Sequence, residues 1–474
     1  MPANSWPDND SYNELDPLNS LFSELSVSEE DSEEELEEET FTSVSLPSRF
    51  QGRRRKAALV LTIVWSGTIA LHLVSWGALF ILGLTTIIGI HVLVVVFARP
   101  KGMSEQIQGD LPSVSVLVAA KNEEAVIGRL VKNLCNLEYP EGQYEVWVID
   151  DNSTDRTPQL LAELAQEYDK LKILRRKPEA GGGKSGALNQ VLGLTKGEIL
   201  AVFDADAQVS SDSLMRVIPL FQRENVGAVQ VRKAIANANE NFWTKGQAAE
   251  MAVDTFLQHQ RTAAGGIGEL RGNGQFVRRE ALLRCGGWNE ETITDDLDLT
   301  LRLHLDKWDI ECVFNPVVEE EGVTNAIALW HQRSRWAEGG YQRYLDYWDL
   351  ILKNRMGTRK TWNLFVFFIL LQYILPTAAV PDLLMAIARH RPPILSPLTG
   401  LTVTVSMAGM FAGLRRIGQQ KEFKLSTYLV LLLQTLRGAL YMFHWIVVIS
   451  STTARMSLRP KRLKWVKTVH QGKE

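Results

Sequence analysis

The sequence predicts an α/β domain, with a doubly wound and mostly parallel sheet, inserted between transmembrane helices. Runs with strand character at residues 114–120 and 144–150 alternate with helical runs at residues 123–137 and 157–168. This alternation is typical of a parallel sheet with helices on both faces. Long, strongly apolar runs flank the region on both sides, and one helix needs about 20 apolar residues to cross a bilayer.

Composition divides the chain further. Residues 1–52 are rich in Ser, Asn, Asp and Glu, and we expect a disordered acidic tail there. Residues 53–98 open with the basic cluster Arg53-Arg54-Arg55-Lys56 and continue with an apolar run at 57–97, long enough for two helices that turn near Trp76. Such a basic cluster tends to stay in the cytoplasm, so the domain at residues 99–345 is expected to be cytoplasmic.

Residues 346–454 hold three more apolar stretches, expected to be transmembrane or interfacial helices at 362–387, 397–414 and 425–450. Pro376 and Pro381 interrupt the first, which leaves the number of crossings open. A basic tail, residues 455–474, closes the chain. The net charge of -4 gives no bias toward nucleic acid, and the three scattered cysteines predict free thiols rather than disulfides or a zinc site.

Two carboxylates, Asp204 and Asp206, directly follow a strand-like run at 201–203. In an extended chain, residues i and i+2 point to the same side. The pair can therefore share Mg²⁺ or Mn²⁺ through oxygen ligands, and such a cation can neutralise a diphosphate as it leaves. Taken alone, the pattern also fits a solvated turn.

Other motifs lie at the expected carboxyl ends of strands, where ligands bind in such sheets. Asp150-Asp151 closes the strand at 144–150, where a carboxylate either caps the next helix or accepts hydrogen bonds from a nucleotide. Lys184 follows three glycines, which predict either a flexible turn or a loop whose backbone approaches a diphosphate. This glycine-rich stretch is not a Walker A motif, because the spacing of that motif would need a glycine where the sequence has Pro178.

Two further motifs lie later in the chain. Asp295 and Asp296 precede an expected helix at 299–305, where acids suit the helix dipole but can also act as a general base. Gln332, Arg335 and Trp336 fall on one face of an expected helix. That face suits a diphosphate and a sugar ring or lipid, or a surface helix beside a membrane.

As an ordered set covering residues 112–340, these motifs resemble the membrane-integrated family 2 glycosyltransferases, such as cellulose, chitin and hyaluronan synthases. Residues 241–250 also resemble the family's interfacial helix. The resemblance implies a GT-A fold and, by position, a role for each residue. Ala120, Glu123 and Asp151 would lie around uridine, Lys184 and Asp204 at the diphosphate, and Gln332 and Arg335 at the pyrophosphate. Asp206, with Asp204, would hold Mg²⁺ or Mn²⁺, and Asp296 would be the base. Asp295 replaces the usual Glu, and Trp336 is assigned to packing or sugar positioning.

Within the family, the chain is most similar to the cyanobacterial monoglucosyldiacylglycerol synthase subfamily in size, acidic tail, basic cluster, helix pair and three-segment C-terminus. This implies an inverting transfer of glucose from UDP-glucose to diacylglycerol in a plasma or thylakoid membrane. A processive polysaccharide synthase is the alternative, although its channel needs enough helices to enclose a polymer. A catalytically dead membrane scaffold is a third hypothesis, and the intact motifs argue against it. The oligomeric state stays open.

Overall fold

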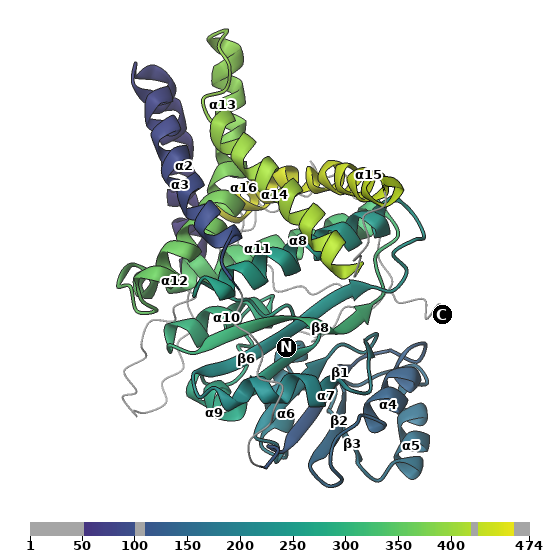
Figure 1. Ribbon diagram of the computed structural model, residues 1–474. Helices are drawn as coiled ribbons and strands as arrows, with labels where there is room; N and C mark the ends of the chain where they lie inside the picture. Colours follow the sequence, from purple (N-terminus) through teal and green to yellow (C-terminus); the bar gives the residue numbers. More distant parts are fainter. Residues whose placement is uncertain (1–51, 100–109, 419–424, 459–474) are drawn as a thin grey trace, which may run out of the picture.

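The computed structural model describes residues 52–99, 110–418 and 425–458 (Figure 1). The expected acidic tail, apart from Gly52, and the basic tail after Leu458 lie outside the described residues. The described chain contains an α/β domain and a set of long apolar helices on one side of it (Figure 1).

The domain is built on one sheet of eight strands in the order β3-β2-β1-β4-β7-β6-β8-β5. The strands are β1 (Val114–Ala120), β2 (Tyr144–Asp150), β3 (Leu171–Arg175), β4 (Ile199–Phe203), β5 (Gln208–Val209), β6 (Val226–Ile235), β7 (Gln275–Arg278) and β8 (Asp309–Glu320). Strands β1 to β4 are mutually parallel, as are β6 and β8, whereas β7 and β5 run antiparallel to their neighbours. The predicted α/β, mostly parallel sheet is confirmed, with antiparallel pairs in its second half.

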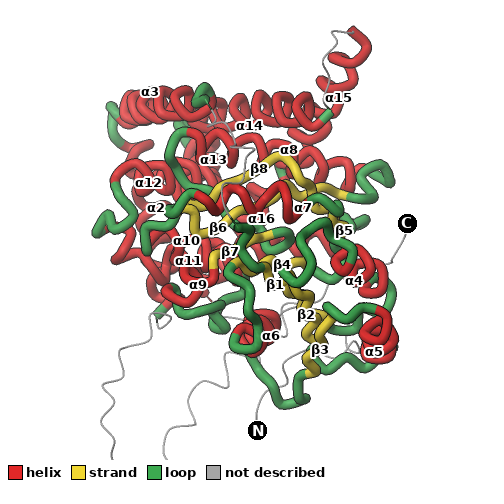
Figure 2. The backbone as a smooth tube through the Cα atoms, turned by 60° about the horizontal axis from the view of Figure 1, so that its bottom comes forward, coloured by secondary structure: helices red, strands yellow, loops and turns green. Residues whose placement is uncertain are grey.

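Helices cover both faces of the first four strands. Figure 2 shows α4 (Ile127–Cys135) and α5 (Thr157–Glu167) on one face and α6 (Gly183–Leu192) on the other. One buried apolar cluster joins α4 and α5 to β1 and β2, and a second joins α6 to the opposite face. The remaining helices of the domain are α7 (Ser213–Val217), η1 (Ile218–Gln222), α8 (Phe242–Ala263), α9 (Arg279–Arg284), α10 (Asp295–Leu305) and α11 (Ala326–Leu352).

Two predicted helix starts were wrong. The helix expected from residue 123 begins at Ile127, because the backbone of Glu123 donates a hydrogen bond to Thr157 Oγ1 and that of Asn122 to Ser153 Oγ. These bonds hold the turn after β1 against the next βα turn. The helix expected from residue 299 begins at Asp295, so its acidic residues occupy the first turn, where the helix dipole favours negative charge.

Five helical segments of the described chain are long and apolar enough to cross a membrane. They are α2 (Arg53–Leu73), α3 (Gly77–Val96), the continuous segment Thr358–Ala388 formed by α12 (Thr358–Asn363), η2 (Leu364–Ile374) and α13 (Leu375–Ala388), α14 (Ser396–Ile417), and Leu425–Leu458, which holds α15 (Leu425–Met442) and α16 (His444–Leu458). The predicted turn near Trp76 is confirmed. The two prolines do not break the first C-terminal stretch, because Pro376 lies in the first turn of α13 and Pro381 is accommodated within the helix.

Helices α8 and α11 join the domain to the apolar helices. Helix α8 packs against α14 and α15, and α11 packs against α16. A buried ion pair between Arg53 at the start of α2 and Asp346 near the end of α11 adds a charged contact. In Figure 1, α2 and α13 rise away from the sheet beyond these two helices. Residues at the carboxyl ends of β1, β2, β4 and β8 line a cavity together with residues of α8 and α11.

Candidate functional site

One cavity of about 610 Å³ collects every residue predicted for the site. It lies where the carboxyl ends of β1, β2 and β4 meet α10 and α11. Its lining includes Ala120, Glu123, Asp151, Lys184, Asp204, Asp206, Asp295, Asp296, Gln332, Arg335 and Trp336. Segments more than 200 positions apart in sequence thus converge on one space, as the ordered motifs predicted.

At one end of the cavity, Asp151 is buried beside a glycine-rich turn. Its Oδ1 atom accepts a hydrogen bond from Arg176 Nη1 at 2.5 Å, and Arg176 Nη2 also donates to the carbonyl oxygen of Gly181. Burial raises the pKa of Asp151, with Arg176 opposing the shift. Within the described residues, Asp151 Oδ2 is buried without a hydrogen-bond partner. Such an acceptor suits a donor group on a ligand.

The predicted phosphate-binding lysine lies next to the first acidic motif. Lys184, in the first turn of α6, places Nζ 2.5 Å from Asp204 Oδ1. Burial alone would lower the pKa of Lys184, but the carboxylates of Asp204, Asp295 and Asp296 outweigh it and raise that pKa above its usual value. Lys184 therefore stays cationic and is available to an anionic ligand in the same space.

The donor set at the end of β4 fits a hard divalent cation that is completed by a ligand. Asp206 is buried, and its Oδ2 accepts a hydrogen bond from the backbone of Glu321 at 3.1 Å. No group of three or more His, Cys, Asp or Glu residues in the described chain is arranged to hold a metal unaided. Two carboxylates leave coordination positions for diphosphate and water oxygens, which Mg²⁺ sites commonly use. Lys184 contacts Asp204, whereas the printed bond to Asp206 comes from a backbone amide, so both carboxylates remain part of the donor set.

The candidate base, Asp296, lies in the first turn of α10. Its Oδ1 atom accepts a hydrogen bond from the backbone of Leu297 at 2.8 Å. Burial, followed by the neighbouring charge of Asp295, raises the pKa of Asp296 to about 6. A carboxylate of that pKa is a stronger proton acceptor than an ordinary aspartate and still ionised at neutral pH.

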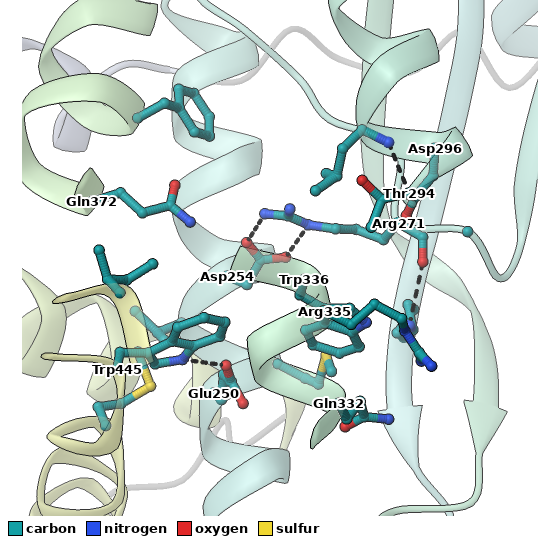
Figure 3. A pocket seen from close by; sticks show the side chains of 18 of the residues that line it. Glu250, Asp254, Arg271, Thr294, Asp296, Gln332, Arg335, Trp336, Gln372 and Trp445 are labelled. Carbon is teal, nitrogen blue, oxygen red and sulfur yellow. Dashed lines mark hydrogen bonds and ion pairs between the residues drawn. The ribbon is translucent and has the colours of Figure 1, made fainter. Parts of the chain in front are cut away.

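A close helix contact sets the position of this motif relative to α11. A Cβ atom built on Gly339 would lie only 2.1 Å from Thr294 Oγ1. Glycine at this place in α11 therefore lets the start of α10 approach the helix that carries Gln332 and Arg335. Burial lowers the pKa of Arg335, while the charges of Asp204 and Asp296 act in the opposite direction. Figure 3 shows Arg335 and Trp336 in the same pocket as Asp296.

Sequence reasoning missed Arg333, inside the motif at 332–336. Its side chain is fully buried and pairs with Glu250 of α8 at 2.5 Å. It also donates to Gln332 Oε1 at 2.7 Å and lies 4.0 Å from the centre of the Trp336 ring. Glu250 further accepts bonds from Tyr441 and Trp445 near the chain's end. Arg333 therefore holds the motif to the C-terminal helices. In the sequence, the resemblance of residues 241–250 to the interfacial helix was the signal that this region contributes to the site.

Three more cavity residues were missed: Arg271, Asp254 and Gln372. Arg271 and Asp254 form an ion pair at 2.6 Å in the middle of the cavity, seen in Figure 3. Gln372 lines the cavity from η2. A polar side chain in a strongly apolar run was a usable sequence signal for Gln372. Arg271 carried none, because charged residues are common between a helix and a strand.

Comparison with known proteins agrees with this geometry. A family model described as "Glycosyltransferase like family 2" matches residues 112–339. The chain is 76% identical over 472 residues to a beta-monoglucosyldiacylglycerol synthase from Nostoc sp., covering 100% of this chain and 99% of that protein. It is 53% identical to a beta-monoglucosyldiacylglycerol synthase from Synechocystis sp., covering 99% and 97%.

A solved mannosyltransferase from Pyrobaculum calidifontis, in complex with GDP-Man and Mn2+, shares the fold. Its TM-score is 0.51 at 20% sequence identity, covering 83% of this chain and 99% of that one. The expectation of a GT-A fold is thereby confirmed. With the site's geometry and the full-length identity of the cyanobacterial proteins, these likenesses show that the chain belongs to the family 2 glycosyltransferases and, within them, to the beta-monoglucosyldiacylglycerol synthases.

Proposed function

We propose that this protein transfers one glucose from UDP-glucose to the free hydroxyl of 1,2-diacylglycerol, with inversion at the anomeric carbon. The observation that carries the proposal is the composition of this cavity. Its polar end holds the acidic and cationic motifs, and its other end is lined by apolar side chains of helices long enough to cross a membrane. A water-soluble nucleotide sugar and a lipid acceptor could therefore meet in it. The names of the cyanobacterial relatives support glucose and diacylglycerol.

The polar end is suited to a nucleotide diphosphate. Asp151 would accept hydrogen bonds from the nucleoside, and Lys184, Gln332 and Arg335 would bind the diphosphate through charge and hydrogen bonds. Asp206, assisted by Asp204, would hold Mg²⁺ or Mn²⁺. When bound, that ion supplies neutralisation of the charge that builds on the leaving diphosphate. Arg333 would keep Gln332 and Trp336 in place from behind.

Asp296 would act as the general base. A lipid hydroxyl is a poor nucleophile at neutral pH, so its proton has to leave as its oxygen attacks the anomeric carbon. The Asp296 carboxylate takes that proton, the new bond from oxygen to carbon forms, and the bond from carbon to the UDP oxygen breaks with its electron pair. Attack from the side opposite UDP turns the α-linked donor into a β-glucoside. Asp295 would tune the base through its charge.

The apolar helices support a multi-pass membrane protein, with the catalytic domain on the cytoplasmic side because Arg53-Arg54-Arg55-Lys56 precedes the first of them. By its relatives, the membrane would be a cyanobacterial plasma or thylakoid membrane. A cytoplasmic domain also has direct access to UDP-glucose, the proposed donor.

Incubating membranes that contain the protein with labelled UDP-glucose and diacylglycerol tests the proposal. We expect a chloroform-soluble glycolipid that a β-glucosidase cleaves. UDP-galactose in parallel tests the donor. An insoluble labelled polymer would favour a polysaccharide synthase, and no product in either fraction would favour a catalytically dead scaffold.

A further inference from the structure

The cavity continues beyond the catalytic carboxylates into an apolar half. This half is lined from α3, α8, η2 with α13, α14, and the end of α15 with α16. Its apolar lining includes Val92, Leu257, Leu371, Val405 and Ile449. Because it is continuous with the polar half, a molecule with an apolar tail and a polar head can place its head at Asp296 while its tail remains among the helices.

Arg271 lies at the boundary between the two halves. A Cβ built on the adjacent Gly272 would lie 3.3 Å from Asp296 Oδ2, so this loop borders the candidate base. The guanidinium is held on two sides, by Asp254 at 2.6 Å and by Glu269 at 2.8 Å, both through Nη2, with Nε also donating to Asp254. These contacts leave the two hydrogens of Nη1 for a ligand. The Arg271 side chain keeps 27% of its surface exposed, although Glu269 is almost fully buried.

Gln372 supplies a second set of donors on the apolar side of Arg271. It is the one amide in the segment Leu364–Ile374, which is otherwise apolar or aromatic and is wound as a π-helix. Such helices are rare and frequently mark functional sites. Polar side chains within apolar spans usually face a cavity or a partner, and Gln372 is exposed where it lines this cavity. Figure 3 shows its amide turned toward the Arg271–Asp254 pair.

The π-helix and the charged group around Arg271 are also in contact. The Phe368 ring, one turn before Gln372, lies 4.6 Å from the Arg261 guanidinium and 5.9 Å from that of Arg343. Arg343 in turn pairs with Glu269 at 2.6 Å, and Glu269 holds Arg271. The positions of Gln372 and Arg271 are therefore coupled through a packed, charged network.

We propose that Arg271 and Gln372 form the acceptor subsite that binds the ester carbonyl oxygens of a diacylglycerol, with its acyl chains in the apolar half of the cavity and its free hydroxyl at Asp296. The two side chains offer N–H donors, and ester carbonyl oxygens are acceptors without charge, so the chemistry is complementary. Asp254 and Glu269 are positioning residues that hold Arg271. The inference rests on the proposed function, since it assigns the acceptor of the same site.

A comparison of ester and ether lipids tests the assignment. Dioleoylglycerol and its dioleyl ether analogue carry the same free hydroxyl and similar chains, but the ether has no carbonyl oxygens. We expect the purified protein to show a several-fold lower KM for the ester. Losing one or two hydrogen bonds changes affinity by about 3- to 100-fold. Gln372→Leu should raise the KM for the ester toward that of the ether, with the KM for UDP-glucose unchanged.

Gln372→Leu replaces a polar side chain with an apolar one inside an apolar helix, so the variant should remain folded. Arg271→Lys keeps the charge but loses the bidentate geometry, and it should reduce the same preference. Thr86→Val is the matched control, because Thr86 is exposed on α3 and bonds its own helix carbonyl at Leu82. This control should keep the wild-type ratio of the two KM values.

Equal KM values for ester and ether in the wild type, or an unchanged ratio in Gln372→Leu, would overturn the assignment while glucolipid synthesis itself continued. A wild type that glucosylates neither lipid would instead overturn the proposed function. A raised KM for UDP-glucose in Gln372→Leu, with the ester-to-ether ratio unchanged, would place Gln372 at the donor and also contradict the assignment.

Discussion

Replacing Asp296 with asparagine keeps the size of the side chain and removes its capacity to take a proton. Loss of a general base typically costs about 10²–10⁴-fold in rate, which corresponds to about 3–5 kcal/mol of transition-state free energy. The donor should still bind, because the contact between Lys184 and Asp204 and the Gln332 and Arg335 side chains remain in place. We therefore expect kcat to fall on that scale with little change in the KM for UDP-glucose.

The pH profile of the wild type provides a second readout. Because burial and the charge of Asp295 raise the pKa of Asp296 to about 6, the proposed base is ionised above that pH and protonated below it. At one pH unit below the pKa, only about a tenth of the molecules keep the carboxylate. Activity should therefore fall as pH drops through about 6, by about tenfold per unit once well below it.

Asp295→Asn is the matched control. It removes the second cause of the raised pKa, so the acid limb of the profile should move to lower pH while turnover stays within about tenfold of wild type. The assay is initial-rate transfer of labelled glucose to diacylglycerol in detergent micelles, with linkage determined on the product. Near-normal turnover of Asp296→Asn, a flat wild-type profile from about pH 5 to about pH 8, or an α-linked glucolipid would refute the reasoning.

Other residues of the site give further predictions. Asp206→Asn should nearly abolish transfer, and EDTA should inhibit the wild type until Mg²⁺ or Mn²⁺ is restored; full activity in excess chelator would contradict the metal assignment. Lys184→Met should raise the KM for UDP-glucose by about ten- to a hundredfold, the scale of one charged hydrogen bond, and an unchanged KM would remove Lys184 from the donor site. Arg333→Met should lower the thermal unfolding temperature in detergent, because an unpaired buried carboxylate costs about 3–5 kcal/mol, and Glu250→Gln in the same background should recover part of the loss.

The strands and the order of the motifs could be predicted because both depend on residues that lie close together in the sequence. β1 and β2 have the expected bounds, and Asp204 follows β4 as expected. An alternating α/β pattern brings the carboxyl ends of its parallel strands to one edge, so motifs at those ends had to meet. Helix starts were less predictable, since Glu123 is held by a hydrogen bond to Thr157, more than thirty positions away.

The structure was needed for residues whose roles depend on distant packing. Arg333 is an ordinary charged residue in sequence, and its partner Glu250 lies 83 positions away. Arg271 gains its place at the boundary of the cavity from Asp254 and Glu269, which come from a helix and a loop that fold against it. Spacing in sequence cannot report such contacts, because they form when apolar surfaces of separate helices and strands are buried together and the remaining charges are forced to pair.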